Sequence, residues 1–364
     1  MILKESFSEE WIRGIQKKYR SDPILTEKVI LALTLLEQLV TCGLDFVFKG
    51  GTSLILLLGT PRRLSIDIDI IVPPKEREFY NQKLDKIIDM GVFTRIEEII
   101  RPSKTEIPKE HYKFFYQSVI NDKQQYILLD ILFDTYPYRQ IVDVDIQSPF
   151  LKTDNNNIKV RVPNINCILG DKLTAFAPNT TGIPYKAGKE MEIIKQLFDI
   201  AVLFDMADDI DEIKYSFQEV ANKEICYRGL EITINDILFD VFETSATIAF
   251  RGEKNMEQYV ELITGAKKMG PYVLGQNFTV DTAIQCASKT AYLAMILLCD
   301  SHSFDKYSEE EVKNLKITNP EYNRLNKLRK ADLVGYYYWC KALELHDKVF
   351  IDSVTLSRNI KISL

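Results

Sequence analysis

The chain contains 364 residues, of which 46% are hydrophobic and 27% are charged, and its formal net charge is −6. Because this length exceeds what one ordinary hydrophobic core holds, we expect two domains. The net negative charge argues against a broad, nonspecific grip on a nucleic acid backbone, which depends on lysine and arginine. The six cysteines are scattered and contain no Cys-x-x-Cys pair, and the chain has three histidines. A zinc site or a Ser-His-Asp triad is therefore not expected.

Two features of the sequence argue against a membrane or secreted protein. No run of uncharged apolar residues approaches membrane-spanning length. The first residues, MILKESFSEEW, are charged where a signal peptide would be apolar. We therefore expect a soluble, cytoplasmic protein that does not associate with a membrane.

The first predicted elements lead to a pair of glycines. A helical region spans roughly residues 9–42, and the apolar run at residues 44–48 predicts a buried strand. Gly50 and Gly51 follow at once. They allow the backbone to turn sharply and to approach a ligand closely.

The residues after the glycines favour an anion site. We expect Thr52 and Ser53 to cap a helix that continues through Leu58. The free N–H groups and the positive dipole end of such a helix would face an anion such as a phosphate. The pattern is not a Walker P-loop, because Lys49 precedes the glycines and no G-x-x-x-x-G-K-[ST] occurs.

A pair of aspartates marks the next predicted strand, RLSIDIDIIV. Side chains alternate along a strand, so Ser65, Asp67 and Asp69 share one face and isoleucines occupy the other. Two carboxylates this close repel each other, and binding a cation relieves the repulsion. Magnesium (Mg²⁺) suits them, since it prefers oxygen ligands and completes its shell with substrate phosphates. The alternative is an exposed aspartate pair on an edge strand, which the surrounding isoleucines disfavour.

Several residues around this pair are candidates for nucleotide binding. Arg63 could neutralise the aspartates or clamp a phosphate with its planar guanidinium, and both roles stay open. The predicted nucleotide-binding residues are Lys49, Gly50, Gly51, Thr52, Ser53, Arg63 and Ser65.

A third carboxylate lies in the following strands. A helix at residues 76–90 precedes predicted strands at residues 92–100, 112–120, 125–133 and 158–162, which together predict a mixed sheet with flanking helices. Asp130 lies in YILLDILF, an apolar run typical of a central strand, where a carboxylate is costly unless it is paired. It could bind the same cation and accept a proton, or it could bond to the backbone or to an arginine. The sequence leaves both open.

The second half of the chain is predicted to be helical. From residue 164 onward the periodicity is helical, with breaks in the PNTTGIPYKAG loop, near Gly252, at Gly270-Pro271 and at Asn319-Pro320. We therefore predict an α/β domain at residues 1–163, which includes the N-terminal helix, and a helical domain at residues 164–364.

Two charged residues of the helical half attract notice. Asp199 interrupts the apolar run LFDIAVLF, which suggests a semi-buried partner, and Lys172 on the preceding helix is a candidate. The alternative for Asp199 is an i,i+4 pair with Lys195, and the alternative for Lys172 is a surface lysine paired with Asp171.

Because the net charge is negative, a nucleic acid could bind only at a local cluster of basic residues. The candidates are Arg62 with Arg63, Lys186 with Lys189, and the run of Arg324, Lys327, Arg329 and Lys330. We interpret the last run as the solvent-exposed face of a helix and not as a nucleic acid site.

These motifs carry a family resemblance. The sequence KGGTSL at residues 49–54, followed by RLSIDID at residues 63–69, resembles the AbiEii-type nucleotidyltransferase toxins of abortive-infection and type IV toxin–antitoxin systems, within the DNA polymerase β superfamily. GDKLTAF at residues 170–176 looks like the family's helix with a catalytic lysine, and KQLFDI at residues 195–200 resembles its following helix with an active-site aspartate. The resemblance spans roughly residues 25–205. No motif matches beyond about residue 210.

The resemblance implies both a fold and an activity. It implies an α/β (α+β) nucleotidyltransferase fold with a mixed sheet, followed by a largely helical C-terminal domain that contributes Lys172 and Asp199 to the site. The implied catalytic residues are Asp67, Asp69, Lys172 and Asp199, with metal ligands Asp67, Asp69 and Asp130. Lys172 would offset negative charge near the triphosphate. Family members modify tRNA 3′ ends, and a cognate antitoxin is implied as a partner.

We therefore expect a magnesium-dependent nucleotidyltransferase. It would transfer a nucleoside monophosphate from a nucleoside triphosphate to an acceptor hydroxyl and release pyrophosphate. Alternatives are transfer to a small molecule or a protein side chain, and a nucleotide-binding interaction protein without turnover.

Overall fold

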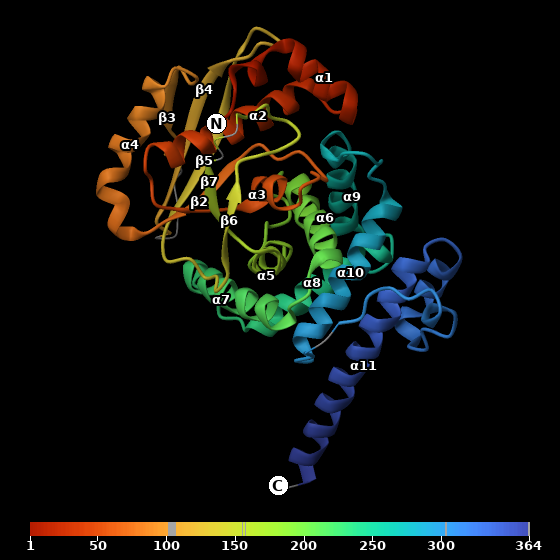
Figure 1. Ribbon diagram of the computed structural model, residues 1–364. Coiled ribbons are helices and arrows are strands. Elements are labelled where there is room, and N and C mark those ends of the chain that lie inside the picture. Colours follow the sequence, from red (N-terminus) through yellow and green to blue (C-terminus); the bar gives the residue numbers. More distant parts are fainter. Residues whose placement is uncertain (101–106, 155, 157, 303, 363–364) are drawn as a thin grey trace. The chain divides into compact units, whose positions relative to one another are not determined.

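The computed structural model describes residues 1–100, 107–154, 156, 158–302 and 304–362; for residues 78, 79 and 350–362 it describes the backbone alone. The chain forms two compact units (Figure 1). The first contains residues 1–164 and 271–277, and the second contains residues 165–270 and 278–364.

The first unit is built on a mixed sheet. Within the described residues, five strands lie in the order β1-β2-β5-β4-β3, with β2 and β5 parallel and the other pairs antiparallel. A separate hairpin pairs β6 with β7. The strands are β1 (Val47–Lys49), β2 (Ile68–Val72), β3 (Arg95–Glu98), β4 (Lys109–Gln117), β5 (Gln124–Phe133), β6 (Ile141–Asp145) and β7 (Lys159–Pro163).

Helices surround this sheet. They are η1 (Lys4–Phe7), α1 (Glu9–Tyr19), α2 (Pro23–Thr41), α3 (Gly50–Leu57), η2 (Pro74–Glu76) and α4 (Arg77–Asp89). Helix α4 covers one sheet face through Tyr80, whose ring meets Tyr112 on β4 and Phe133 on β5. By strand alternation, the opposite face carries Asp69 and Asp130.

The second unit is helical. Its elements are α5 (Ile165–Ala175), α6 (Glu190–Met206), α7 (Ile210–Arg228), α8 (Ile234–Ala249), α9 (Met256–Met269), α10 (Val280–Leu298), η4 (Glu311–Lys313), η5 (Pro320–Lys330) and α11 (Leu333–Ile362), with η3 (Gly270–Tyr272) at its junction with the first unit. Side-chain caps from Asp209, Thr233, Asn255 and Thr279 begin α7 to α10. Aromatic rings fill its core, with Phe204 packed against Tyr292 and Tyr338.

The predicted fold class is confirmed: an α/β core with a mixed sheet is followed by a largely helical region. Some details differ from the sequence-based expectations. The N-terminal helical region is two helices, because Ser21-Asp22-Pro23 ends α1 and caps α2. Strand β6 was not predicted. Among the described residues, no helix is both long and apolar enough to cross a membrane.

A short segment of the second half of the sequence returns to the first unit. Residues 272–274 bind the stretch before β2: Leu64 N donates to Tyr272 O at 2.8 Å, and Leu274 N donates to Arg62 O at 2.9 Å. The observed boundary at Asn164 and Ile165 lies beside the predicted one, but the sequence gives no sign of this return.

Candidate functional site

Four polar side chains form one row across the sheet. Lys49 on β1 is in register with Asp69 on β2, Asp69 with Asp130 on β5, and Asp130 with His111 on β4. Residues in register on neighbouring strands present their side chains to the same face. The row therefore gathers a lysine, two carboxylates and a histidine on the face opposite α4.

The start of α3 lies against this row. Gly50 has a φ of +78°, and a Cβ there would collide with the Asp69 carboxylate. A Cβ on Gly51 would collide with the Arg63 guanidinium and lie 2.9 Å from Ser65 Oγ. Glycine at both positions thus lets Asp69, Arg63 and Ser65 approach the first turn of α3, where backbone N–H groups lack helical partners.

The predicted roles of Thr52 and Ser53 as helix caps are wrong. The helix begins at Gly50, directly after β1, so both residues lie inside its first turn and are fully buried. Thr52 Oγ1 donates to Asp67 O at 2.6 Å, and Ser53 Oγ donates to Gly50 O at 2.8 Å. Thr52 therefore fixes the backbone of Asp67, the residue immediately before β2.

Both the backbone and the side chain of Arg63 are fixed by contacts. Its backbone bridges to Val273 in the returning segment, its Nη1 donates to Leu64 O at 3.0 Å, and it is 6% exposed. A buried guanidinium over Gly51 places a fixed positive charge beside the start of α3.

Asp130 has a partner that the sequence analysis did not include. His111 Nδ1 and Asp130 Oδ1 lie 2.6 Å apart, with the side chains 15% and 33% exposed. Since a carboxylate accepts hydrogen bonds, His111 Nδ1–H is the donor in this contact. His111 lies 19 residues before Asp130 and is identified only by strand register.

The donor set of Asp67 and Asp69 suits a hard cation. Among the described residues, no three His, Cys, Asp or Glu side chains are close enough to hold a metal ion. Magnesium, however, commonly uses one or two carboxylates and takes its remaining ligands from water and phosphate. Asp67 and Asp69 fit that requirement, because they are two carboxylates close to the glycine start of α3: Thr52 binds Asp67 O, and the Asp69 carboxylate lies against Gly50. The magnesium role of Asp130 stays a prediction.

Within the helical unit, the predicted partnership of Lys172 and Asp199 is confirmed. Lys172 Nζ on α5 lies 2.7 Å from Asp199 Oδ2 on α6, with side-chain exposures of 7% and 2%. Lys172 also donates to Gln196 Oε1 at 3.0 Å. Both side chains are buried, so Lys172 is not the surface lysine of the alternative interpretation. Lys195, the other candidate partner of Asp199, lies 3.5 Å from Glu192.

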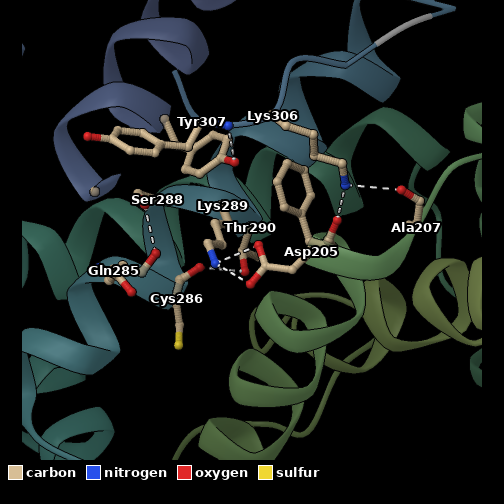
Figure 2. Close-up of polar contacts among 12 residues, drawn as sticks. Asp205, Ala207, Gln285, Cys286, Ser288, Lys289, Thr290, Lys306 and Tyr307 are labelled. Carbon is tan, nitrogen blue, oxygen red and sulfur yellow. Dashed lines mark hydrogen bonds and ion pairs between the residues drawn. The ribbon is translucent and has the colours of Figure 1, made fainter. Parts of the chain in front are cut away.

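A second charged cluster anchors the same helix (Figure 2). Lys289 Nζ on α10 donates to both oxygens of Asp205, at 2.7 and 2.6 Å. Lys306 donates to the carbonyl oxygens of Phe204 and Ala207 at the C-terminal end of α6. A cation at this end satisfies carbonyls that lack helical partners and matches the helix dipole. The cluster therefore fixes the end of the helix that carries Asp199.

The predicted basic patches are mostly engaged in surface contacts. Lys186 Nζ lies 2.8 Å from Glu257, with both side chains more than 70% exposed. Arg324 pairs with Glu253, and Arg329 donates to Lys313 O at 2.6 Å. The last run forms the 3₁₀ helix η5, in which Tyr322 and Leu325 are buried and the basic side chains lie outside the core.

Comparison with known proteins agrees with the motifs. The family model "Nucleotidyl transferase AbiEii toxin, Type IV TA system" matches residues 34–265, which is more than half of the chain. No curated protein matches.

Several solved structures are similar to this chain, including the following two. JHP933 from Helicobacter pylori is 17% identical, with a TM-score of 0.42 over 76% of this chain and 93% of that one. An antigenic nucleotidyltransferase-like protein from Paracoccidioides brasiliensis is 16% identical, with a TM-score of 0.34 over 56% of this chain and 89% of that one.

Proposed function

The chain belongs to the AbiEii nucleotidyl transferase toxin family of type IV toxin–antitoxin systems, and we propose that it transfers a nucleoside monophosphate to the 3′ end of a tRNA in the cytoplasm. Membership supports nucleotidyl transfer from a nucleotide substrate and an antitoxin partner. The acceptor, the magnesium dependence and the residue roles are the proposed part.

The observation that supports the proposal most is the row of Lys49, Asp69, Asp130 and His111 beside the glycine start of α3. Carboxylates and the N-terminal turn of a helix meet there, which is what a metal-bound triphosphate requires. Magnesium bound by Asp67 and Asp69 would supply charge neutralisation of the triphosphate and orientation of its phosphates.

The chain's own residues have separate tasks in this proposal. The acceptor hydroxyl oxygen attacks the α-phosphorus, the bond to the β-phosphate breaks, and pyrophosphate leaves. Asp130, oriented by His111 Nδ1, accepts the hydroxyl proton. Gly50, Gly51 and Arg63 hold the phosphates, and Lys49 and Ser65 contribute at the edges of the site. Lys172 and Asp199 remain proposed catalytic residues on the basis of the family motif.

Radiolabel transfer tests the proposal. The purified chain is incubated with each α-labelled nucleoside triphosphate, magnesium and total RNA, and label should enter RNA of tRNA size. Asp67→Asn or Asp69→Asn should lower transfer by at least about a hundredfold, because electrostatic stabilisation of the transition state is lost. The matched control is Asp143→Asn, an exposed aspartate of β6.

Three outcomes would contradict parts of the proposal. Undiminished transfer in excess chelator excludes magnesium. Label in protein or in a small molecule favours the alternative acceptors. Nucleotide binding without any transfer favours an interaction protein without turnover.

A further inference from the structure

A second polar surface lies on the same face of the sheet as the carboxylates. Three residues in register, Arg95 on β3, Phe115 on β4 and Tyr126 on β5, form a row across three strands. Asp130 and Tyr126 are four residues apart on β5, so this row lies about 13 Å along the strand from the carboxylates. Even spacing keeps both rows on one face.

Cations surround the two aromatic rings of this row. The Arg95 guanidinium carbon is 3.4 Å from the centre of the Phe115 ring. The Tyr126 ring has Lys113 Nζ at 5.0 Å and Lys28 Nζ, from α2, at 5.4 Å. The two rings are themselves 5.8 Å apart. We call these five residues the cation–aromatic platform.

The platform is open to solvent at its centre. Tyr126 is 38% exposed, although large aromatic side chains are usually more deeply buried, and the Arg95 side chain is 47% exposed. Glu97 pairs with Arg95 at 2.7 Å and offsets one of the three positive charges. Two lysines and one arginine thus lie around the exposed ring on a chain whose overall charge is negative, with Glu97, Glu27 and Asp67 as the neighbouring acids.

Lys28 connects the platform to the proposed site. Burial lowers the pKa of Lys28, and the negative charge of Asp67 partly offsets that effect. Lys28 is therefore within electrostatic range of Asp67 and also lies beside the Tyr126 ring.

We propose that the cation–aromatic platform binds the single-stranded end of the nucleic acid acceptor, an inference that rests on the proposed function. Its cations meet phosphates and Tyr126 stacks on a base. Proteins that bind single strands combine these two features, a positive surface along the backbone and aromatic rings for the bases. Such a strand would run along β4 and β5 toward the carboxylate row.

Fluorescence anisotropy with a fluorescein-labelled, ten-nucleotide single-stranded RNA tests the platform, without triphosphate or magnesium. Tyr126→Ala should weaken binding at least about fivefold, because a stacking contact is lost, whereas Tyr126→Phe should bind like the parent. Lys113→Glu should weaken binding and reduce the slope of log affinity against log salt by about 0.7. The matched control is Lys86→Glu, an exposed lysine on α4, which covers the other face.

Any of three results would overturn the inference. The parent protein does not bind the RNA, the Lys113→Glu variant binds it like the parent, or the Lys86→Glu variant loses as much RNA affinity as the Lys113→Glu variant. Thermal unfolding identifies any variant that fails to fold, and Lys113→Glu, at a partly exposed position, serves if Tyr126→Ala does fail. Transfer assays separate this inference from the proposed function. Variants of the platform should still show Asp67-dependent transfer. If the parent shows no transfer at all, the differences in RNA binding among the platform variants should still be seen.

Discussion

Two lysine–aspartate pairs connect helix α6 to its neighbours, and they differ in their exposure to solvent. Asp199 and Asp205 both lie on α6, where Asp199 pairs with Lys172 on α5 and Asp205 with Lys289 on α10. The Asp199 side chain is 2% exposed, whereas that of Asp205 is 53% exposed. Water reaches one pair and is excluded from the other.

The difference teaches which pair needs a functional explanation. A sealed ion pair must offset the loss of hydration of both charges, so apolar replacement of the whole pair is often neutral or stabilising. A pair that stays partly hydrated avoids most of that cost and can serve simply to dock α6 on α10. The sealed pair of Lys172 and Asp199 is therefore the better candidate for a role in the reaction.

The largest expected effect comes from breaking the sealed pair on one side. Asp199→Ala leaves the Lys172 ammonium buried without its carboxylate, and the free energy of unfolding should fall by about 3–5 kcal/mol. Asp205→Ala should cost only about 1–2 kcal/mol, because water can replace the exposed carboxylate. Urea unfolding followed by circular dichroism measures both. Equal losses would remove the distinction between the pairs.

Replacing each pair as a whole separates stability from function. Lys172→Met with Asp199→Leu should leave the free energy of unfolding within about 2 kcal/mol of the parent. The same protein should lose nucleotidyl transfer by roughly a hundredfold or more if Lys172 acts on transition-state charge. The control is Lys289→Met with Asp205→Leu, which should keep its transfer activity. Retained transfer in the first double variant would make its pair structural.

Parts of this comparison could be predicted from sequence. Asp199 stands in an apolar run, and burial of a carboxylate demands a partner, so its pairing across helices followed from a local pattern. The pairing of Lys289 with Asp205 gave no such signal, because Asp205 lies at a boundary where an exposed aspartate is ordinary. The breaks predicted in the PNTTGIPYKAG loop, near Gly252 and at Gly270-Pro271 lie between helices as expected, since Gly and Pro act locally. The breaks between α6 and α7 and between α7 and α8 were not predicted.

What the sequence could not predict depends on contacts between distant segments. His111 and the cation–aromatic platform follow from strand register, which links residues on three or four strands. The return of residues 271–277 to the first unit has no local signal. The helix at Gly50 began earlier than its apparent caps because Thr52 bonds to Asp67 O instead, a choice fixed by β2.

The smallest expected effect is a pH dependence of the free energy of unfolding, caused by Lys306 near the exposed Asp205. Burial lowers the pKa of Lys306, and the nearby charge of Asp205 opposes that shift. Between the lowered pKa and the ordinary lysine pKa of about 10.4, the unfolded chain binds more protons than the folded chain. The free energy of unfolding contributed by Lys306 therefore rises with pH across this window and is least favourable below it.

Urea unfolding at several pH values from about 7 to 10 checks this sign. The parent should gain stability relative to Lys306→Met as the pH rises. Asp205→Asn should enlarge the gain, because without the neighbouring negative charge the folded-state pKa of Lys306 falls further. The pair of Lys172 and Asp199 lies elsewhere on α6, so Asp199→Asn should leave the Lys306 response unchanged. A loss of stability with rising pH relative to Lys306→Met would show that the lysine is favoured in its charged form, and Asp205 would then have to be counted as part of a tightly coupled cluster.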